Sequence, residues 1–184
     1  MSEICCRGWN GSYAGQGLAV ARDIYWNMTE ADVSIWAQFA LVYTCPQVNC
    51  TSGGQQFVNI DPDFSENFKM PAYYALRQFS KYIRPGAVRV GLNCSGCTSN
   101  ATIGRIQKAV AFQSPGGKYI VVMVNDQGGA TRFAVSGLPA GVYEITGVDP
   151  GHTSGMAFSP VTLAAGQNLT VNFAGQAIVT LVQR

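Results

Sequence analysis

Six cysteines are the residues of this sequence whose spacing most directly suggests chemistry. Cys94 and Cys97 form a CxxC motif, which occurs in redox sites, in metal sites and as a local disulfide. A zinc site needs a second pair of Cys or His ligands at suitable spacing, and the only histidine is His152. Cys45 and Cys50 bracket another short loop. In an oxidising compartment both pairs are expected to form local disulfides.

Glycosylation motifs indicate which compartment applies. Six of the ten asparagines begin an N-x-S/T sequon, whereas about one would be expected by chance from the Ser and Thr content. The sequons begin at Asn10, Asn27, Asn49, Asn93, Asn100 and Asn168. This excess predicts a secreted, extracellular glycoprotein, and it favours disulfides over a metal or redox role. The adjacent Cys5 and Cys6 could pair with cysteines elsewhere or stay free.

Charge and hydropathy exclude other classes of protein. The formal net charge is +2 and only 12% of residues are charged, so no basic surface for nucleic acid is expected. The longest apolar stretch, residues 35–43, is too short to span a bilayer. The opening MSEICCRGW lacks the basic and apolar regions of a signal peptide. Together with the sequons, this suggests a chain that starts partway through a longer protein. Its oligomeric state stays open.

The first part of the sequence alternates helical and strand patterns. Residues 16–28 place Leu18, Ala21, Ile24 and Met28 at helical spacing. Residues 33–42 are apolar, β-branched and aromatic, which predicts a strand buried on both faces, as in a parallel sheet. A polar loop over residues 44–69 follows, and Pro71 suits the first position of a helix over 71–83. Residues 1–83 therefore read as the end of an α/β domain.

From residue 84 onward, short strands replace the helices. Eight strand-like runs are separated by turns rich in Gly and Pro: 87–93, 105–113, 118–125, 131–136, 141–149, 159–164, 168–173 and 177–183. Strands at such regular spacing without intervening helices predict an all-β antiparallel sandwich over residues 84–184. His152 falls in a Gly-rich turn and is expected at the surface.

Three segments resemble a known family. PAYYALRQFSKYIRPGAVRVGL (71–92) is similar to the junction between barrel and sandwich in glycoside hydrolase family 30, which includes glucosylceramidases and endo-β-1,6-glycanases. AVAFQSPGGKYIVVMVND (109–126) resembles the sandwich hairpin of that family, and AIVTLV (177–182) resembles its last strand. The resemblance implies that residues 1–83 are the C-terminal remnant of a (β/α)8 catalytic barrel.

The resemblance also implies site residues. Family members use a carboxylate nucleophile and a second carboxyl group, about 5–5.5 Å apart, to cleave glycosides with retention. Met1-Ser2-Glu3 matches the end of the family's nucleophile motif, so Glu3 is the expected nucleophile. Trp36 lies where the family places an aromatic wall of the sugar site, although a buried tryptophan is also ordinary core. Gln38 could bind a sugar hydroxyl, or it could be an inward polar residue of the barrel.

The family's acid/base, a Glu that follows Asn at the end of the fourth barrel strand, has no match here. Asp61, Asp63 and Glu66 are expected to be solvated. The chain alone is therefore expected to be inactive, although it resembles part of a retaining β-glycosidase. The implied substrate is a polysaccharide, an oligosaccharide or a glycolipid, with neither a metal nor an organic cofactor. The alternative hypothesis is a non-catalytic sandwich module that binds carbohydrate or supports a fold.

Overall fold

A computed structural model of the chain describes residues 2–4, 13–38, 40–44, 56–95, 97–100 and 105–184. The chain divides into two compact units, residues 1–76 and residues 77–184. The described part of the first unit mixes short strands with helices, and the second unit is almost entirely β-structure. The assignment of residues 1–83 to a catalytic barrel stays a prediction. Cys5, Cys6, Cys45 and Cys50 lie outside the described residues.

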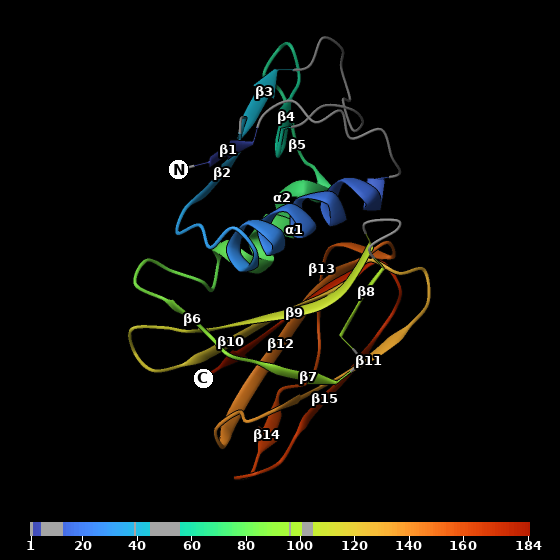
Figure 1. Cartoon of the computed structure of the whole chain (residues 1–184). Helices are drawn as coiled ribbons and strands as arrows, with labels where there is room; N and C mark the ends of the chain where they lie inside the picture. Colours follow the sequence, from blue (N-terminus) through green and yellow to red (C-terminus); the bar gives the residue numbers. More distant parts are fainter. Residues whose placement is uncertain (1, 5–12, 39, 45–55, 96, 101–104) are drawn as a thin grey trace. The chain divides into compact units, whose positions relative to one another are not determined.

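The first unit opens with a β-α-β arrangement. Strand β1 (Ser2–Ile4) is followed by helix α1 (Tyr13–Thr29) and strand β2 (Trp36–Gln38). The two strands pair in parallel (Figure 1). A parallel pair needs a crossover connection, which the helix supplies. The predicted helix over 16–28 is confirmed, and Leu18, Ala21 and Ile24 lie on its buried side.

The prediction of one fully buried strand over residues 33–42 is wrong. The described part of this segment forms the short β2, and β3 (Val42–Thr44) begins where the prediction ends. Ile35 and Leu41 are 55% and 60% exposed. Among the described strands β2 pairs with β1 alone, so the other edge of β2 lacks the neighbouring strand that burial inside a parallel sheet requires.

A small sheet and the first part of a second helix complete the unit. Strand β3 pairs in parallel with β4 (Val58–Ile60), which pairs antiparallel with β5 (Asn67–Lys69). Helix α2 (Pro71–Ser80) begins at the predicted proline. It ends at Ser80, three residues before the predicted end at residue 83. Its buried residues include Ala72, Ala75 and Phe79, whereas the predicted Tyr73 and Leu76 are only half-buried.

The two helices approach closely at Gly17. A Cβ atom at this position would lie 3.1 Å from the main-chain oxygen of Pro71 and 3.5 Å from the Cβ of Ala75. A side chain on Gly17 would therefore push against the backbone at the start of α2. The absence of a side chain allows α1 to pack directly against α2 within the first unit.

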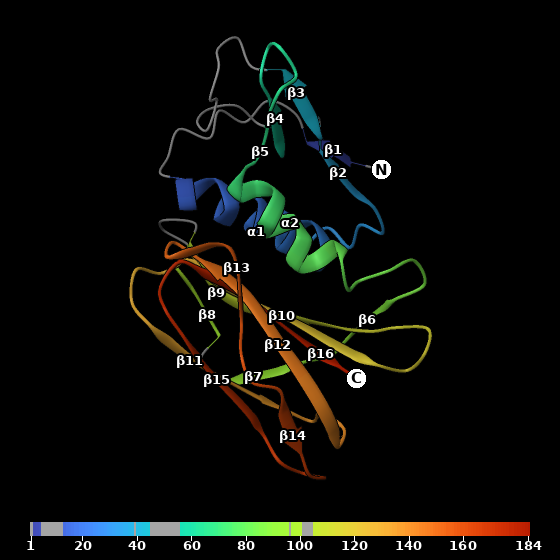
Figure 2. The same cartoon turned by 180° about the vertical axis from the view of Figure 1, so that it is seen from behind.

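The second unit is a sandwich of two sheets, as predicted (Figure 2). The larger sheet has the order β13-β12-β16-β10-β9-β6, with β14 also paired to β12 and β8 to β9. Its strands are β6 (Val88–Val90), β8 (Thr98–Asn100), β9 (Arg105–Gln113), β10 (Tyr119–Asn125), β12 (Gly141–Asp149), β13 (His152–Ala157), β14 (Val161–Leu163) and β16 (Ala177–Gln183). The smaller sheet has the order β15-β11-β7, with β7 (Asn93–Ser95), β11 (Thr131–Ser136) and β15 (Leu169–Phe173).

One apolar core fills the space between the sheets. Val121, Met123 and Leu181 come from the larger sheet, while Phe133 and Val171 come from the smaller one. In the smaller sheet, the Phe133 ring stacks on that of Phe173 with centroids 5.1 Å apart. Alternation of inward apolar and outward polar residues along β11 and β15 produces this inner face.

Buried Tyr143 illustrates how the core accommodates a polar group. Its hydroxyl donates a hydrogen bond of 2.9 Å to the main-chain oxygen of Pro139. Burial, and to a lesser extent Tyr119, raises the pKa of the Tyr143 hydroxyl. The side chain is therefore neutral at physiological pH, as its place in the core requires.

Strand β13 was not predicted. His152 begins this strand, and its ring Nδ1 lies 3.0 Å from Oδ1 of Asp149. The sequence HTSGMA is mostly small and polar, so neither alternation nor a β-branched run marks it as a strand. It forms because β12 offers its edge, and β13 lies at the end of the larger sheet. The expected exposure of His152 is confirmed.

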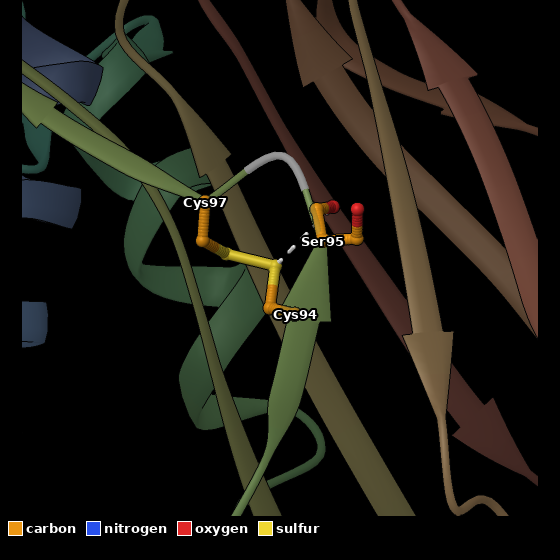
Figure 3. Close-up of a disulfide and its surroundings, with 3 residues drawn as sticks. All are labelled: Cys94, Ser95 and Cys97. Atoms are coloured by element: carbon orange, nitrogen blue, oxygen red, sulfur yellow. Dashed lines mark hydrogen bonds between the residues drawn. A yellow bond between two sulfur atoms is a disulfide. The ribbon is translucent and has the colours of Figure 1, made fainter.

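A disulfide joins Cys94 to Cys97, which confirms the structural interpretation of the CxxC motif (Figure 3). Cys94 lies in β7 of the smaller sheet, and Cys97 directly precedes β8 of the larger sheet. The bond therefore fixes the point at which the chain crosses from one sheet to the other.

Candidate active site

The backbone places position 3 beside the tryptophan-bearing strand. In the parallel pairing of β1 with β2, Ser2 is opposite Trp36, Glu3 opposite Ala37 and Ile4 opposite Gln38. Parallel strands end at the same edge of a sheet, so these residues lie at one end of the β-α-β unit. This is the relationship that the sequence comparison of Glu3 with a strand-end nucleophile requires.

Alternation along β2 separates the three candidate residues into two groups. Successive residues of a strand belong to opposite faces of the sheet. Trp36 and Gln38 therefore share one face, while Ala37, the register partner of Glu3, belongs to the other. The structure brings the strands of Glu3 and Trp36 together, but it does not bring Trp36 to the face that Ala37 occupies.

Both predicted substrate-binding side chains are half-buried. The indole Nε1 of Trp36 is buried and has no hydrogen-bond partner in the described part of the chain. A tryptophan N–H usually finds a partner when it is buried, so this donor remains available to another group. The roles of Trp36 and Gln38 in sugar binding stay predictions.

Strand β4 and the residues that flank it bury two polar side chains, which the sequence does not predict. Phe57, Asn59 and Asp61 alternate with less buried residues, and they are 2%, 0% and 1% exposed. The expectation that Asp61 is solvated is therefore wrong. Asp61 follows the buried Asn59 by two residues and continues the same alternation of burial. A strand with polar residues on its buried face has no hydrophobic alternation, so the sequence offers no clear signal for it.

The polar groups on this face are only partly satisfied. The Asn59 amide donates to Sδ of Met70 at 3.3 Å, and its oxygen accepts from the Gln56 amide. One carboxylate oxygen of Asp61, Oδ1, is buried without a hydrogen-bond partner among the described residues. Buried oxygens without partners are uncommon in folded proteins. Asp61 is thus a chemically distinctive carboxyl group of the first unit.

The hairpin tip is exposed and follows the expectation for Asp63 and Glu66. The Asp63 carboxylate accepts hydrogen bonds from the hydroxyl and the main-chain N–H of Ser65, at 2.7 and 3.1 Å. These bonds favour the charged form and lower the pKa of the Asp63 carboxyl group below its ordinary value. Asp63 is therefore ionised at neutral pH and is unsuited to act as a general acid.

The described residues contain neither a metal cluster nor a membrane-spanning helix. Within the described ranges, no group of three or more His, Cys, Asp or Glu side chains is placed to hold a metal ion. In the same part of the chain, no helix has the length and apolar character needed to cross a membrane.

Residues 86–181, which include nearly the whole sandwich, match the model of the glycosyl hydrolase family 30 beta sandwich domain. The chain belongs to glycosyl hydrolase family 30. The resemblance to this family is therefore confirmed. No match to this sequence was found among curated proteins.

Solved structures share the fold of this family 30 chain. It is 24% identical to the catalytic domain of family 30 xylanase C from Talaromyces cellulolyticus, with a TM-score of 0.75. The alignment covers 100% of this chain and 38% of that one. For a family 30 endoxylanase from Clostridium papyrosolvens, the identity is 18%, the TM-score 0.72 and the coverage 100% and 41%. The chain is 17% identical to the family 30 subfamily 8 xylanase Xyn30A from Clostridium acetobutylicum, with a TM-score of 0.69. The alignment covers 99% of this chain and 41% of that one.

These alignments extend over residues 1–76 as well as the sandwich, because each covers nearly all of this chain. The chain spans about two fifths of the length of the structures it matches. At these levels of identity the likeness concerns the fold and not the reaction.

Proposed function

We propose that this chain forms the C-terminal part of a retaining β-glycosidase that acts on a β-linked glycan or glycolipid. The observation that carries the proposal is the parallel register of β1 and β2, with Glu3 opposite Ala37. Two consecutive parallel strands joined by a helix are the repeating unit of a (β/α)8 barrel, in which catalytic residues lie at the carboxyl ends of strands.

In the proposed reaction, Glu3 attacks the anomeric carbon and forms a glycosyl ester, and water then hydrolyses that ester. A second carboxyl group first protonates the leaving oxygen and later takes a proton from the water. We assign this acid/base to the part of the fold that the xylanase structures have beyond the matched two fifths. On this proposal, the 184-residue chain alone does not cleave glycosides.

The substrate is a polysaccharide, an oligosaccharide or a glycolipid. Family 30 membership supports a glycan substrate, and the matched structures are named as xylanases. A β-linked xylan is therefore the first substrate to assay, followed by other β-glucans and a glucosylated lipid. The sequons and the Cys94–Cys97 disulfide support an extracellular place of action.

Substitution of Glu3 in the complete open reading frame tests the nucleophile. Glu3→Gln should abolish turnover, and Glu3→Ala should regain activity with added azide, yielding a glycosyl azide of inverted configuration. A matched control is Glu30→Gln, because Glu30 is exposed just after α1; this variant should keep full activity. Unchanged turnover in Glu3→Gln would reject the proposal. Measurable hydrolysis by the 184-residue chain would reject the external acid/base.

The binding roles of Trp36 and Gln38 need a separate test, since these residues share a face that excludes Ala37. If they hold the sugar, Trp36→Ala and Gln38→Ala should raise KM strongly for the same substrate. If Trp36 is instead a core residue, Trp36→Ala should lower the thermal stability. The variant protein that remains folded should then have an unchanged KM.

A non-catalytic sandwich module is the second candidate, favoured by the confinement of the family-model match to residues 86–181. This hypothesis predicts that the full chain binds oligosaccharides, which calorimetric titration would detect. Glu3→Gln and Trp36→Ala should leave this binding unchanged. The absence of heat on titration with xylo- and gluco-oligosaccharides would count against it.

A further inference from the structure

The sequon at Asn168 lies in the surroundings that N-glycosylation requires. Asn168 is exposed at the end of the turn between β14 and β15. The turn is tight, because Gln167 N–H donates to the Ala164 oxygen at 3.2 Å and Gly166 adopts a positive φ of 78°. Glycans are bulky and hydrophilic, so they belong on surface turns of this kind.

The sequon at Asn27 shows the opposite arrangement. It lies in the last turns of α1, where the Asn27 amide donates to the Asp23 oxygen at 2.7 Å. The hydroxyl of Thr29 donates to the Tyr25 oxygen at 2.8 Å. Both polar groups of this sequon are therefore engaged by the helix backbone. Asn10 and Asn49 lie outside the described residues.

We propose that Asn168 carries an N-linked oligosaccharide. The donor is a lipid-pyrophosphate-linked oligosaccharide of the secretory pathway. Nδ2 of Asn168 forms a bond to the anomeric carbon of the first sugar. The bond from that carbon to the pyrophosphate oxygen breaks, the lipid pyrophosphate leaves, and the amide nitrogen loses one proton. This modification is independent of the proposed glycosidase activity.

Secretion of the full chain from a eukaryotic host, behind a cleavable signal, tests the site. Enzymatic release of the glycans in heavy-oxygen water converts each modified Asn to labelled Asp, which peptide mapping detects. Label is expected at Asn168 and not at Asn27. Asn168→Gln and Thr170→Val should each remove one glycan from the intact mass, and Asn27→Gln should remove none. An unlabelled Asn168, or a labelled Asn27 in the soluble protein, would overturn the assignment.

Discussion

The hydroxyl of Thr180 donates to two atoms of Gln78, the main-chain oxygen and the side-chain Oε1, each at 2.9 Å. Thr180 is fully buried in β16, and Gln78 is 5% exposed in the last turn of α2. The same Oε1 accepts a hydrogen bond from Thr146 at 3.2 Å, and Thr146 also contacts the hydroxyl of Tyr82. This polar network fixes the end of the helix to the larger sheet within the second unit.

Thr180→Val should destabilise the second unit. Valine fills the same space but leaves the buried Gln78 oxygens with fewer donors, which costs about 1–3 kcal/mol. The free energy of unfolding, measured by urea denaturation, should fall by that amount. Thr162→Val, at an exposed position of β14, is the matched control and should change it little. Equal stability of the two variants would contradict a structural role for the network.

Gly175→Ala should be strongly destabilising because two loops touch at this residue. A Cβ at position 175 would lie 2.2 Å from the main-chain oxygen of Gly128, so one loop must move. Overpacking of this kind costs roughly 1–3 kcal/mol. A Cβ at Gly129 meets nothing within 4 Å, and Gly129→Ala is the control. A Gly175→Ala protein with unchanged thermal midpoint would show that the contact is easily relieved.

Removal of the Cys94–Cys97 disulfide should lower stability modestly. The bond joins residues only three apart in sequence, so it restricts the unfolded chain little, by roughly 2 kcal/mol in the chain-entropy model. The double variant Cys94→Ser, Cys97→Ser should unfold at a lower urea concentration. Ser95→Ala, in the same segment, should not. A loss far above the predicted value would mean that the bond also holds the folded crossing between the sheets.

Ser65→Ala should raise the pKa of the Asp63 carboxyl group toward its ordinary value of 3.8, because Ser65 supplies the hydrogen bonds that lower it. A carboxyl group whose pKa is lower in the folded state stabilises that state at pH values above its ordinary pKa. This stabilisation is lost as the pH falls through the pKa of the folded state. Carboxyl-carbon NMR titration measures the shift directly. Ser34→Ala, at an exposed position elsewhere, is the control and should leave the Asp63 titration unchanged. An unshifted titration curve in Ser65→Ala would show that the Ser65 hydroxyl does not lower the pKa of Asp63.

Much of the second unit was predictable because its strands carry local signals. The boundaries of β9, β11, β12 and β16 coincide with the predicted strands. The short strands at the crossing between the two sheets were harder to predict. The predicted strand 87–93 divides into β6 and the start of β7. The reason is that a change of sheet depends on the partners available in space and leaves no mark on the alternation.

Residue order alone determined the sandwich, the start of the helix at Pro71, the Cys94–Cys97 pair and the family, because turn residues, periodicity and motif spacing are local properties. Only the tertiary structure decided that position 3 is opposite Ala37 and that Asp61 is buried. Each of these depends on which distant segment lies alongside, and strand register and burial are created by that pairing.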